Sequence, residues 1–352
     1  MRLSMKFLII SMLLATVTSC GKTGDTGKVS PPVNPVGENT FTNPLLSSGP
    51  DPYVTQKDAV YYFTCTLGDR ISVYPTAKMS QLGKSLPQTV FTPPSTGETS
   101  KDLWAPEIYY EQNKWYIYYA ADDGNDANHR MYVLESNSST PLSGFSFKAK
   151  LTPTTDQWAI DGTILNLNNQ LYMLWSGWRT ANSSGNQQIY IAAMSNPYTI
   201  TGDRVLISQP DFDWEKQGGN VNEGPEVLVN PQGKVYVTYS ASSCFNDSYA
   251  MGLLSLKTNG DPMNPGDWTK SAEPVLKTLP AAGAYGPGHN GFFTSPDGKE
   301  SWLIYHANSL ASQGCGNTRN PRMQKFSWNT DGSPNFGVPV SINTKITVPS
   351  GD

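Results

Sequence analysis

The feature of this sequence that most limits its fold is a hairpin pattern that occurs five times. In each copy an apolar strand leads into a short polar turn, and an aromatic strand follows that ends in a small polar residue. The copies recur at roughly sixty-residue intervals, a spacing typical of repeat architectures, and no long segment has the apolar period of a helix. The aromatic strands of the five copies are residues 60–64, 115–120, 171–176, 235–240 and 302–307.

This repeat favours a radial arrangement of sheets. An interval of roughly sixty residues is long enough for a four-stranded antiparallel sheet with long loops. One such sheet cannot bury both faces, but several around an axis cover each other's faces and protect their edges. We therefore predict an all-β fold, a five-bladed β-propeller that forms a single domain over residues 41–347. A β-sandwich is the competing all-β architecture, but it does not require such regular hairpin copies.

The first twenty residues are typical of an export signal. Arg2 and Lys6 give the segment a positively charged N-terminal region, and the apolar stretch that follows is too short to span a bilayer. The stretch ends at residues 17–20, which resemble a bacterial lipobox; the alternative is an ordinary cleaved signal with an incidental cysteine. In either case we expect an exported protein, with 1–20 as signal peptide, 21–40 as flexible tether and Cys20 as lipid anchor to a bacterial membrane.

Three further cysteines are expected in an oxidising compartment. Cys65, Cys244 and Cys315 are an odd number, which allows one disulfide and one buried thiol. Among the possible pairings we favour Cys244–Cys315. No Cys-x-x-Cys spacing is present, so we expect no zinc cluster.

The composition narrows the class of ligand. A net charge of −4 and the absence of a basic run argue against nucleic acid as a partner. Aromatic residues are 11% of the chain and charged residues only 15%, which suits a neutral, hydroxyl-rich ligand such as a sugar. The alternative is that the aromatic residues only fill the core between sheets.

A polar residue beside glycine or proline stands near the start of the first strand in every copy. These residues are Asp51, Glu107, Asp161, Glu223 and His289. The innermost strands of a propeller line its central channel, so we expect these side chains to converge. Gathering carboxylates in one place raises their pKa values, and cleavage of a glycosidic bond needs one carboxylate and one carboxylic acid. The alternative is that they only cap turns.

These motifs together resemble glycoside hydrolase family 43, which consists of five-bladed propellers that cleave arabinose- or xylose-containing polysaccharides with inversion. The resemblance covers nearly the whole chain after residue 40. It depends on the order and spacing of five segments, which are residues 49–54, 104–107, 160–163, 223–226 and 286–290.

The resemblance implies roles for individual residues. Asp51 is similar to the general base that deprotonates water, Glu223 to the general acid, and Asp161 to the carboxylate that orients the acid and raises its pKa. Further expected substrate contacts are Trp104, His289 and Arg322, whereas Glu107 and Glu226 are expected to bond structurally between blades. The chemistry requires no cofactor. His289 is also expected near a structural Ca or Na ion that is held mostly by water.

The substrate is expected to be plant cell-wall arabinan or arabino-oligosaccharides. The segments 115–135, 175–178 and 322–324 resemble exo-acting α-L-arabinofuranosidases that cleave α-1,5 linkages. Endo-1,5-α-L-arabinanase and β-xylosidase are the alternatives within this family. A non-catalytic sugar-binding surface lipoprotein is the alternative of a different class.

Overall fold

The computed structural model describes residues 39–183 and 185–352. The expected signal peptide 1–20 and nearly all of the expected tether 21–40 lie outside these residues. Residues 39–352 form one compact unit, and its regular structure is almost entirely β-strand, which confirms the all-β prediction. No helix in the described part of the chain is long and apolar enough to cross a bilayer. The short 3₁₀ helices are η1 (Met79–Lys84), η2 (Asp126–Asn128), η3 (Asp213–Glu215), η4 (Pro265–Asp267) and η5 (Pro280–Ala282).

The strands form antiparallel meanders in chain order. Three of them are separate four-stranded sheets, ordered β2-β3-β4-β5, β6-β7-β8-β9 and β18-β19-β20-β21. Their strands are β2 (Tyr53–Lys57), β3 (Val60–Thr64), β4 (Ile71–Thr76), β5 (Gln88–Phe91), β6 (Lys101–Glu111), β7 (Lys114–Asp122), β8 (Arg130–Ser136), β9 (Phe145–Lys150), β18 (Tyr285–Thr294), β19 (Ser301–Asn308), β20 (Asn320–Trp328) and β21 (Pro334–Asn335).

The remaining meanders belong to one eight-stranded sheet. They are joined by a short parallel pairing between β12 and β14 at Asn186–Asn220 and Gln187–Val221. Their strands are β10 (Ala159–Leu167), β11 (Gln170–Trp178), β12 (Asn186–Asn196), β13 (Thr199–Ser208), β14 (Asn220–Val229), β15 (Val235–Ala241), β16 (Ala250–Leu256) and β17 (Trp268–Lys270).

All five predicted hairpins are present, as the pairs β2–β3, β6–β7, β10–β11, β14–β15 and β18–β19. The short turns within these hairpins explain why the hairpin pattern recurs so regularly in the sequence. Asn168 and Asn169 link β10 to β11 with φ values of 53° and 64°, as a two-residue type I′ turn requires. Asparagine tolerates this left-handed conformation better than most residues.

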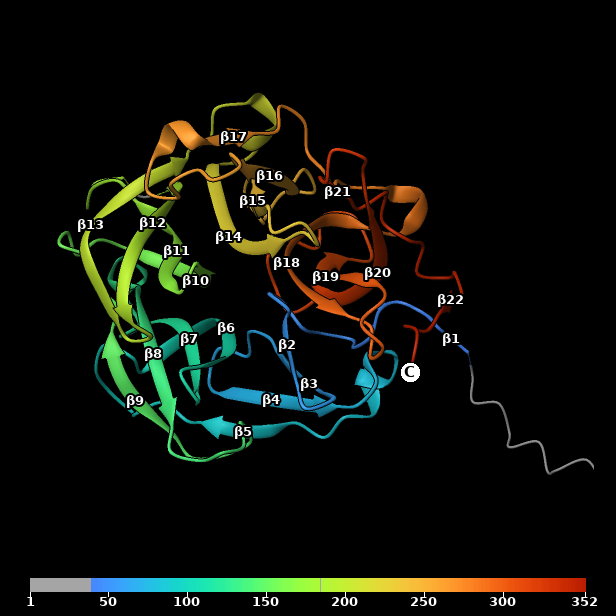
Figure 1. Cartoon of the computed structure of the whole chain (residues 1–352), viewed down its shortest axis with the longest axis horizontal. Coiled ribbons are helices and arrows are strands. Elements are labelled where there is room, and N and C mark those ends of the chain that lie inside the picture. The colour runs from blue at the N-terminus through green and yellow to red at the C-terminus, as the bar shows by residue number, and fades with distance from the viewer. Residues whose placement is uncertain (1–38, 184) are drawn as a thin grey trace, which may run out of the picture. The chain divides into compact units, whose positions relative to one another are not determined.

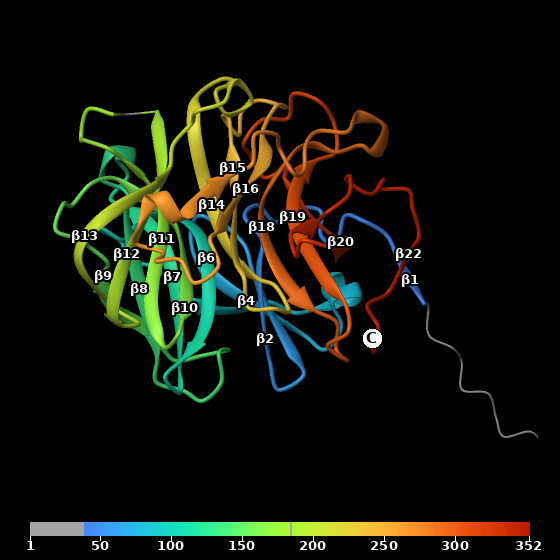
Figure 2. The ribbon, with the colours of Figure 1, turned by 45° about the horizontal axis from the view of Figure 1, so that its top comes forward.

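The first strand of each hairpin lies at the centre of the unit. β2, β6, β10, β14 and β18 each contact the next strand in this order, and β18 contacts β2. Figure 1 shows the sheets arranged around this centre in chain order, from blue to red, and the turned view in Figure 2 shows the same succession.

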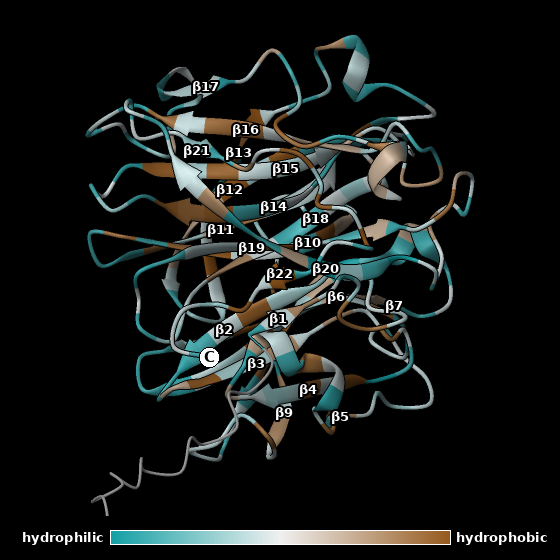
Figure 3. Cartoon of the chain, turned by 90° about the vertical axis from the view of Figure 1, so that its right-hand side faces the viewer, coloured by the Kyte–Doolittle hydropathy of each residue, from teal (hydrophilic) through white to brown (hydrophobic). Residues whose placement is uncertain are grey.

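The hydrophobic core is divided into clusters that each draw on two successive sheets. One pair of residues from each cluster is Val73 and Ile117, Met131 and Trp175, Leu174 and Val237, Tyr236 and Leu303, and Phe63 and Ile304. Burial of one such large side chain stabilises the fold by about 1.5–3 kcal/mol. Figure 3 shows the apolar residues concentrated in the strands, with the connecting loops mostly hydrophilic. The apolar alternation in the sequence therefore corresponds to sheet faces that cover one another.

Two further contacts join distant parts of the chain. β1 (Thr40–Phe41) pairs with β22 (Ile346–Thr347), and the Asn43 side chain exchanges two hydrogen bonds with the backbone of Met323 at 2.9 and 3.0 Å. The first described segment is thereby fixed to the last sheet. A disulfide joins Cys244 to Cys315, which confirms the favoured pairing, and Cys65 is a buried thiol.

Candidate active site

Asp161, Glu223 and His289 lie where the central strands depart from regular pairing, and Asp51 lies just before β2. Asp51, Asp161, Gly224 and His289 have positive φ values of 54°, 58°, 52° and 36°. Register shifts flank Asp161, Gly224 and His289 in their strands. Such bulges redirect side chains, and left-handed backbone in residues other than glycine costs about 1–3 kcal/mol and is concentrated at functional sites. The glycines and prolines next to these residues in the sequence therefore lie in the same irregular stretches of backbone.

Gly224 shows why glycine must follow Glu223. A Cβ atom at this position would lie 3.0 Å from Cγ of His289 and 3.1 Å from its Nδ1. The His289 imidazole therefore lies directly against the backbone of β14. Any other residue would have to displace this ring as well as adopt an unfavourable φ.

Asp51 is held as a carboxylate. Its Oδ1 accepts a hydrogen bond from Nη1 of Arg319 at 2.8 Å and lies 3.3 Å from Nδ1 of His289. The Asp51 backbone N–H donates to Nδ1 of His306 at 3.1 Å. Burial raises the pKa of Asp51, but the Arg319 guanidinium is the largest of the effects that oppose burial, and together they hold this pKa well below its usual range. Asp51 is thus charged at neutral pH.

The two histidines beside Asp51 are largely neutral. Burial lowers the pKa of His289, and it lowers that of His306 still further. Since Nδ1 of His306 accepts the Asp51 N–H, His306 positions the backbone of this residue. The positive charge next to Asp51 is therefore that of Arg319.

Glu223 differs from Asp51 because its pKa is raised rather than lowered. Its Oε1 accepts a hydrogen bond from the Tyr249 hydroxyl at 2.8 Å. Burial of the carboxyl group raises the pKa of Glu223 to about 7; the negative Asp51 adds to this effect, while the Tyr249 hydrogen bond opposes it. With a pKa of about 7, Glu223 carries a proton in a large share of molecules near neutral pH. Part of the Glu223 surface remains exposed, so a ligand can reach it.

Asp161 is hydrogen-bonded to the backbone of the residue that follows Glu223. Its Oδ2 accepts a hydrogen bond at 2.9 Å from the backbone N–H of Gly224, which fixes the strand that carries Glu223. Burial first, and then the charges of Glu223 and Asp51, raise the pKa of Asp161 well above its usual range. The charge of Glu223 raises the pKa of Asp161 and the charge of Asp51 raises that of Glu223, and the expected effect of Asp161 on Glu223 stays a prediction. The three carboxyl groups therefore lie close enough to one another for their charges to interact.

Together these groups form an acid–base pair. One carboxylate with a depressed pKa can accept a proton from water, and one carboxylic acid with a pKa of about 7 can donate a proton to a leaving oxygen. Hydrolysis of a glycosidic bond requires these two functions.

The expected sugar contacts lie in different environments. Trp104, on β6, is partly buried and stacks on His129 with ring centroids 4.0 Å apart. Arg322, on β20, is completely buried. Its Nε donates to Asn320 at 2.9 Å and its Nη2 to the carbonyl oxygen of Asn308 at 3.1 Å. The arginine that contacts Asp51 is Arg319, which the sequence analysis did not single out.

A second carboxyl pair lies outside this acid–base site. Glu107 accepts a hydrogen bond from Tyr109 at 2.6 Å, and Glu226 accepts one from Thr163 at 3.2 Å. Burial raises the pKa of Glu107 to about 8 and raises that of Glu226 well above its usual range. Tyr109 lies on β6 with Glu107, whereas Thr163 on β10 joins Glu226 on β14 and lies 2.8 Å from the Tyr109 hydroxyl, so the set links neighbouring sheets as expected.

The described residues near His289 do not form a set of protein ligands for the expected ion. No group of three or more His, Cys, Asp and Glu residues in the described ranges could hold a metal ion. Nδ1 of His289 already faces Asp51, and Ca²⁺ prefers several oxygen ligands. An ion here would depend mostly on water, and no catalytic step is assigned to it.

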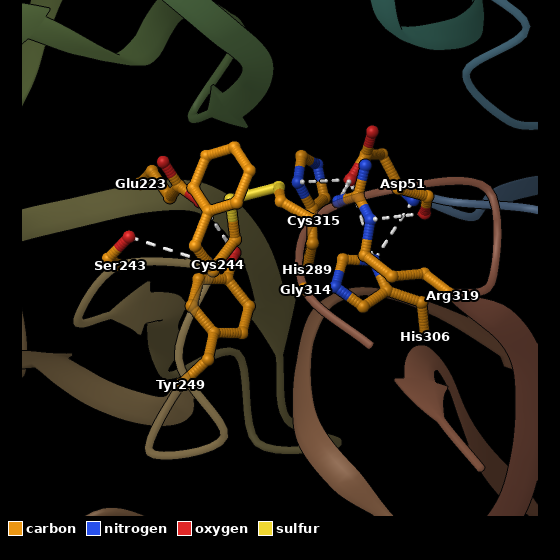
Figure 4. Close-up of a disulfide and its surroundings, with 12 residues drawn as sticks. Asp51, Glu223, Ser243, Cys244, Tyr249, His289, His306, Gly314, Cys315 and Arg319 are labelled. Carbon is orange, nitrogen blue, oxygen red and sulfur yellow. Dashed lines mark hydrogen bonds and ion pairs between the residues drawn. A yellow bond between two sulfur atoms is a disulfide. The ribbon is translucent and has the colours of Figure 1, made fainter. Parts of the chain in front are cut away.

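The sequence analysis missed Arg319 and Tyr249, which bind Asp51 and Glu223. Both residues lie on loops that the Cys244–Cys315 disulfide joins (Figure 4). The loop with Tyr249 follows β15, and the loop with Arg319 precedes β20. The two cysteines were the only signal in the sequence that these loops meet.

Comparison with known proteins agrees with the geometry. The family model described as glycosyl hydrolases family 43 matches residues 41–334. An extracellular exo-α-(1→5)-L-arabinofuranosidase of Streptomyces avermitilis is 38% identical over 344 residues, covering 95% of this chain and 70% of that protein. An α-L-arabinofuranosidase of Humicola insolens is 35% identical over 346 residues, covering 96% of this chain and 69% of that protein.

A solved structure gives the same result. The crystal structure of an α-L-arabinofuranosidase from Lactobacillus brevis superposes with a TM-score of 0.81 at 33% identity, covering 86% of this chain and 98% of that one. The family match covers most of the chain and includes every predicted site residue. The chain therefore belongs to glycoside hydrolase family 43.

Proposed function

We propose that this protein is an exo-acting α-L-arabinofuranosidase that releases L-arabinofuranose, with inversion, from arabinan or arabino-oligosaccharides. The observation that carries the hydrolytic role is the pairing of charged Asp51 with protonated Glu223 around one centre. The choice of arabinose and of α-1,5 linkages is supported by the names of the relatives from Streptomyces and Humicola.

In the proposed mechanism, Asp51 takes a proton from a water molecule as the water oxygen attacks the anomeric carbon. Glu223 donates its proton to the glycosidic oxygen as the bond to the leaving sugar breaks, so one C–O bond forms and one is lost. Asp161 positions Glu223 through the Gly224 N–H, and Arg319 keeps Asp51 charged. Trp104 and His289 are proposed to contact the sugar, and Arg319 is proposed for the arginine contact that we expected from Arg322.

We further propose that residues 41–347 are one catalytic domain with five propeller blades. The closed succession of central strands from β2 to β18 and back to β2 supports this number. We propose export to a bacterial membrane, with a lipid anchor at Cys20. The word "extracellular" in the names of two Streptomyces relatives supports export, and the mass of the N-terminal peptide of the native protein would test the anchor.

Product analysis on linear arabinan tests the proposed function. We expect arabinose as the only product from the earliest times. Mixed oligosaccharides would indicate endo-1,5-α-L-arabinanase instead, and release of xylose from xylobiose without release of arabinose would indicate a β-xylosidase. Binding of arabino-oligosaccharides with no product after prolonged incubation would indicate a sugar-binding lipoprotein.

Replacing Tyr249 by Phe should move the alkaline limb of the kcat/KM profile to higher pH. The Tyr249 hydroxyl donates to Glu223 and lowers the pKa of this acid. Without this hydrogen bond the pKa rises, and the active protonated form persists to higher pH. The measurement is kcat/KM on arabinotriose across the pH range, with the melting temperature as the control for folding. A shift of the limb to lower pH would contradict this account of Glu223.

A further inference from the structure

The loop between β15 and β16 is fixed at four points. The Ser242 N–H donates to the carbonyl oxygen of Val221 on β14 at 3.2 Å, and the Cys244 sulfur is bonded to Cys315. Asp247 accepts the Ser312 N–H with both carboxylate oxygens at 3.0 Å, and Tyr249 donates to Glu223 at 2.8 Å. These contacts hold the loop to the strand of the acid on one side and to the loop of Arg319 on the other.

This loop stands on the leaving-group side of the proposed reaction. A general acid lies beside the oxygen that it protonates, and therefore beside the departing sugar. Tyr249 connects the loop to the acid Glu223, whereas Arg319 on the opposite loop bonds the base Asp51. In the view of Figure 4 the disulfide lies between Glu223 and Asp51. The two joined loops thus carry the residues that bind the proposed acid and the proposed base.

Phe245 is the exposed large apolar residue of this anchored loop. It follows Cys244 directly and is 77% exposed. Its Cδ1 would lie 3.7 Å from a Cβ atom on Gly314, so its ring lies next to the opposite loop. Leu310 on that loop is also exposed, at 66%. An aromatic ring on a disulfide-bonded loop that is mostly left exposed by the described residues is a pre-organised apolar contact.

We propose that Phe245 is a platform for the sugar on the leaving-group side, so that its ring contacts the apolar face of the second arabinose unit of the substrate. The assignment rests on the proposed function, because the acid identifies the leaving-group side. A ring with one open face suits a neutral sugar, which presents C–H groups and no charge. Phe245 would then favour oligosaccharides over substrates with a small leaving group.

The test compares two substrates in matched variants. Arabinotriose has a sugar as its leaving group, whereas methyl α-L-arabinofuranoside has only methanol. In Phe245→Ala we expect the ratio of kcat/KM for arabinotriose to that for the methyl glycoside to fall roughly fivefold, the size expected for one lost aromatic contact. Phe245→Tyr should retain the ratio. Leu86→Ala is the control, since Leu86 is equally exposed at 77% and has no proposed role.

An unchanged ratio in Phe245→Ala, or an equal fall in Leu86→Ala, would overturn the platform. Failure of the proposed function gives a different result: wild-type protein would release xylose and no arabinose. The same ratio would then be measured with xylotriose and methyl β-xyloside. If the protein binds the sugar without hydrolysing it, the proposal is tested by binding. Phe245→Ala in the Glu223→Gln background should then weaken arabinotriose binding by a similar factor. Equal affinity in the two proteins would also overturn the proposal.

Discussion

Asp51→Asn is expected to lower kcat/KM on arabinotriose roughly 10³-fold, within the range for a lost general base. Asparagine has nearly the same shape, but it cannot take a proton from water. It also tolerates the positive φ of 54° at this position, so the backbone should persist where alanine would be strained. The measurement is steady-state kinetics together with the melting temperature.

A nucleophile that needs no deprotonation provides the control for Asp51→Asn. Added azide should restore part of the turnover of this variant and give a glycosyl azide of inverted configuration. Residual activity of Asp51→Asn within tenfold of wild type would show that Asp51 is not the base. Loss of the melting transition would instead show that the Arg319–Asp51 pair at 2.8 Å is needed for folding.

Glu223→Gln should produce a loss of similar size on arabinotriose, roughly 10³-fold, because the leaving oxygen then departs without a proton. The loss should be small on an aryl arabinofuranoside with an acidic phenol as its leaving group, since that oxygen needs no protonation. Asp51→Asn should be equally impaired on both substrates. An equal loss of Glu223→Gln on the two substrates would contradict its role as the acid.

The pH profile gives a second test of Glu223. A general acid must be protonated, so kcat/KM of the wild type should fall as pH rises through about 7, the pKa of Glu223. The base must be deprotonated, and because the pKa of Asp51 is depressed, the acidic limb should lie below the usual aspartate range. In Glu223→Gln the alkaline limb should disappear. A limb near pH 7 that persists in this variant would belong to another group.

The hairpin repeat made most of the fold predictable from the sequence. Each turn is local, as Asn168 and Asn169 show, and each aromatic strand is buried by the sheets on both sides. The positions of Asp51, Asp161 and Glu223 relative to their strands were also local, so their convergence followed from the repeat. Equivalent residues of the five copies occupy equivalent positions in their sheets. The position of one carboxyl group relative to its hairpin was therefore sufficient to predict the positions of the others.

The partners of these carboxyl groups were not predictable in the same way. Arg322 lies on β20 and is buried, whereas Arg319 lies on the loop before this strand. The sequence motif indicated Arg322 as a sugar contact and gave no signal for Arg319, which the loop before β20 brings to Asp51. Tyr249 reaches Glu223 from a loop whose path depends on the Cys244–Cys315 bond. Such contacts depend on loop conformation, which has no period in the sequence.

The most direct test of the account is the anomeric configuration of the sugar when it is first released, followed by proton NMR with wild-type protein and an α-linked arabinofuranoside. Direct attack of a water molecule activated by Asp51 predicts that β-L-arabinofuranose forms first and then mutarotates to the equilibrium mixture. Initial formation of the α-anomer would require a covalent intermediate and two displacements. That result would contradict the roles assigned to Asp51 and Glu223.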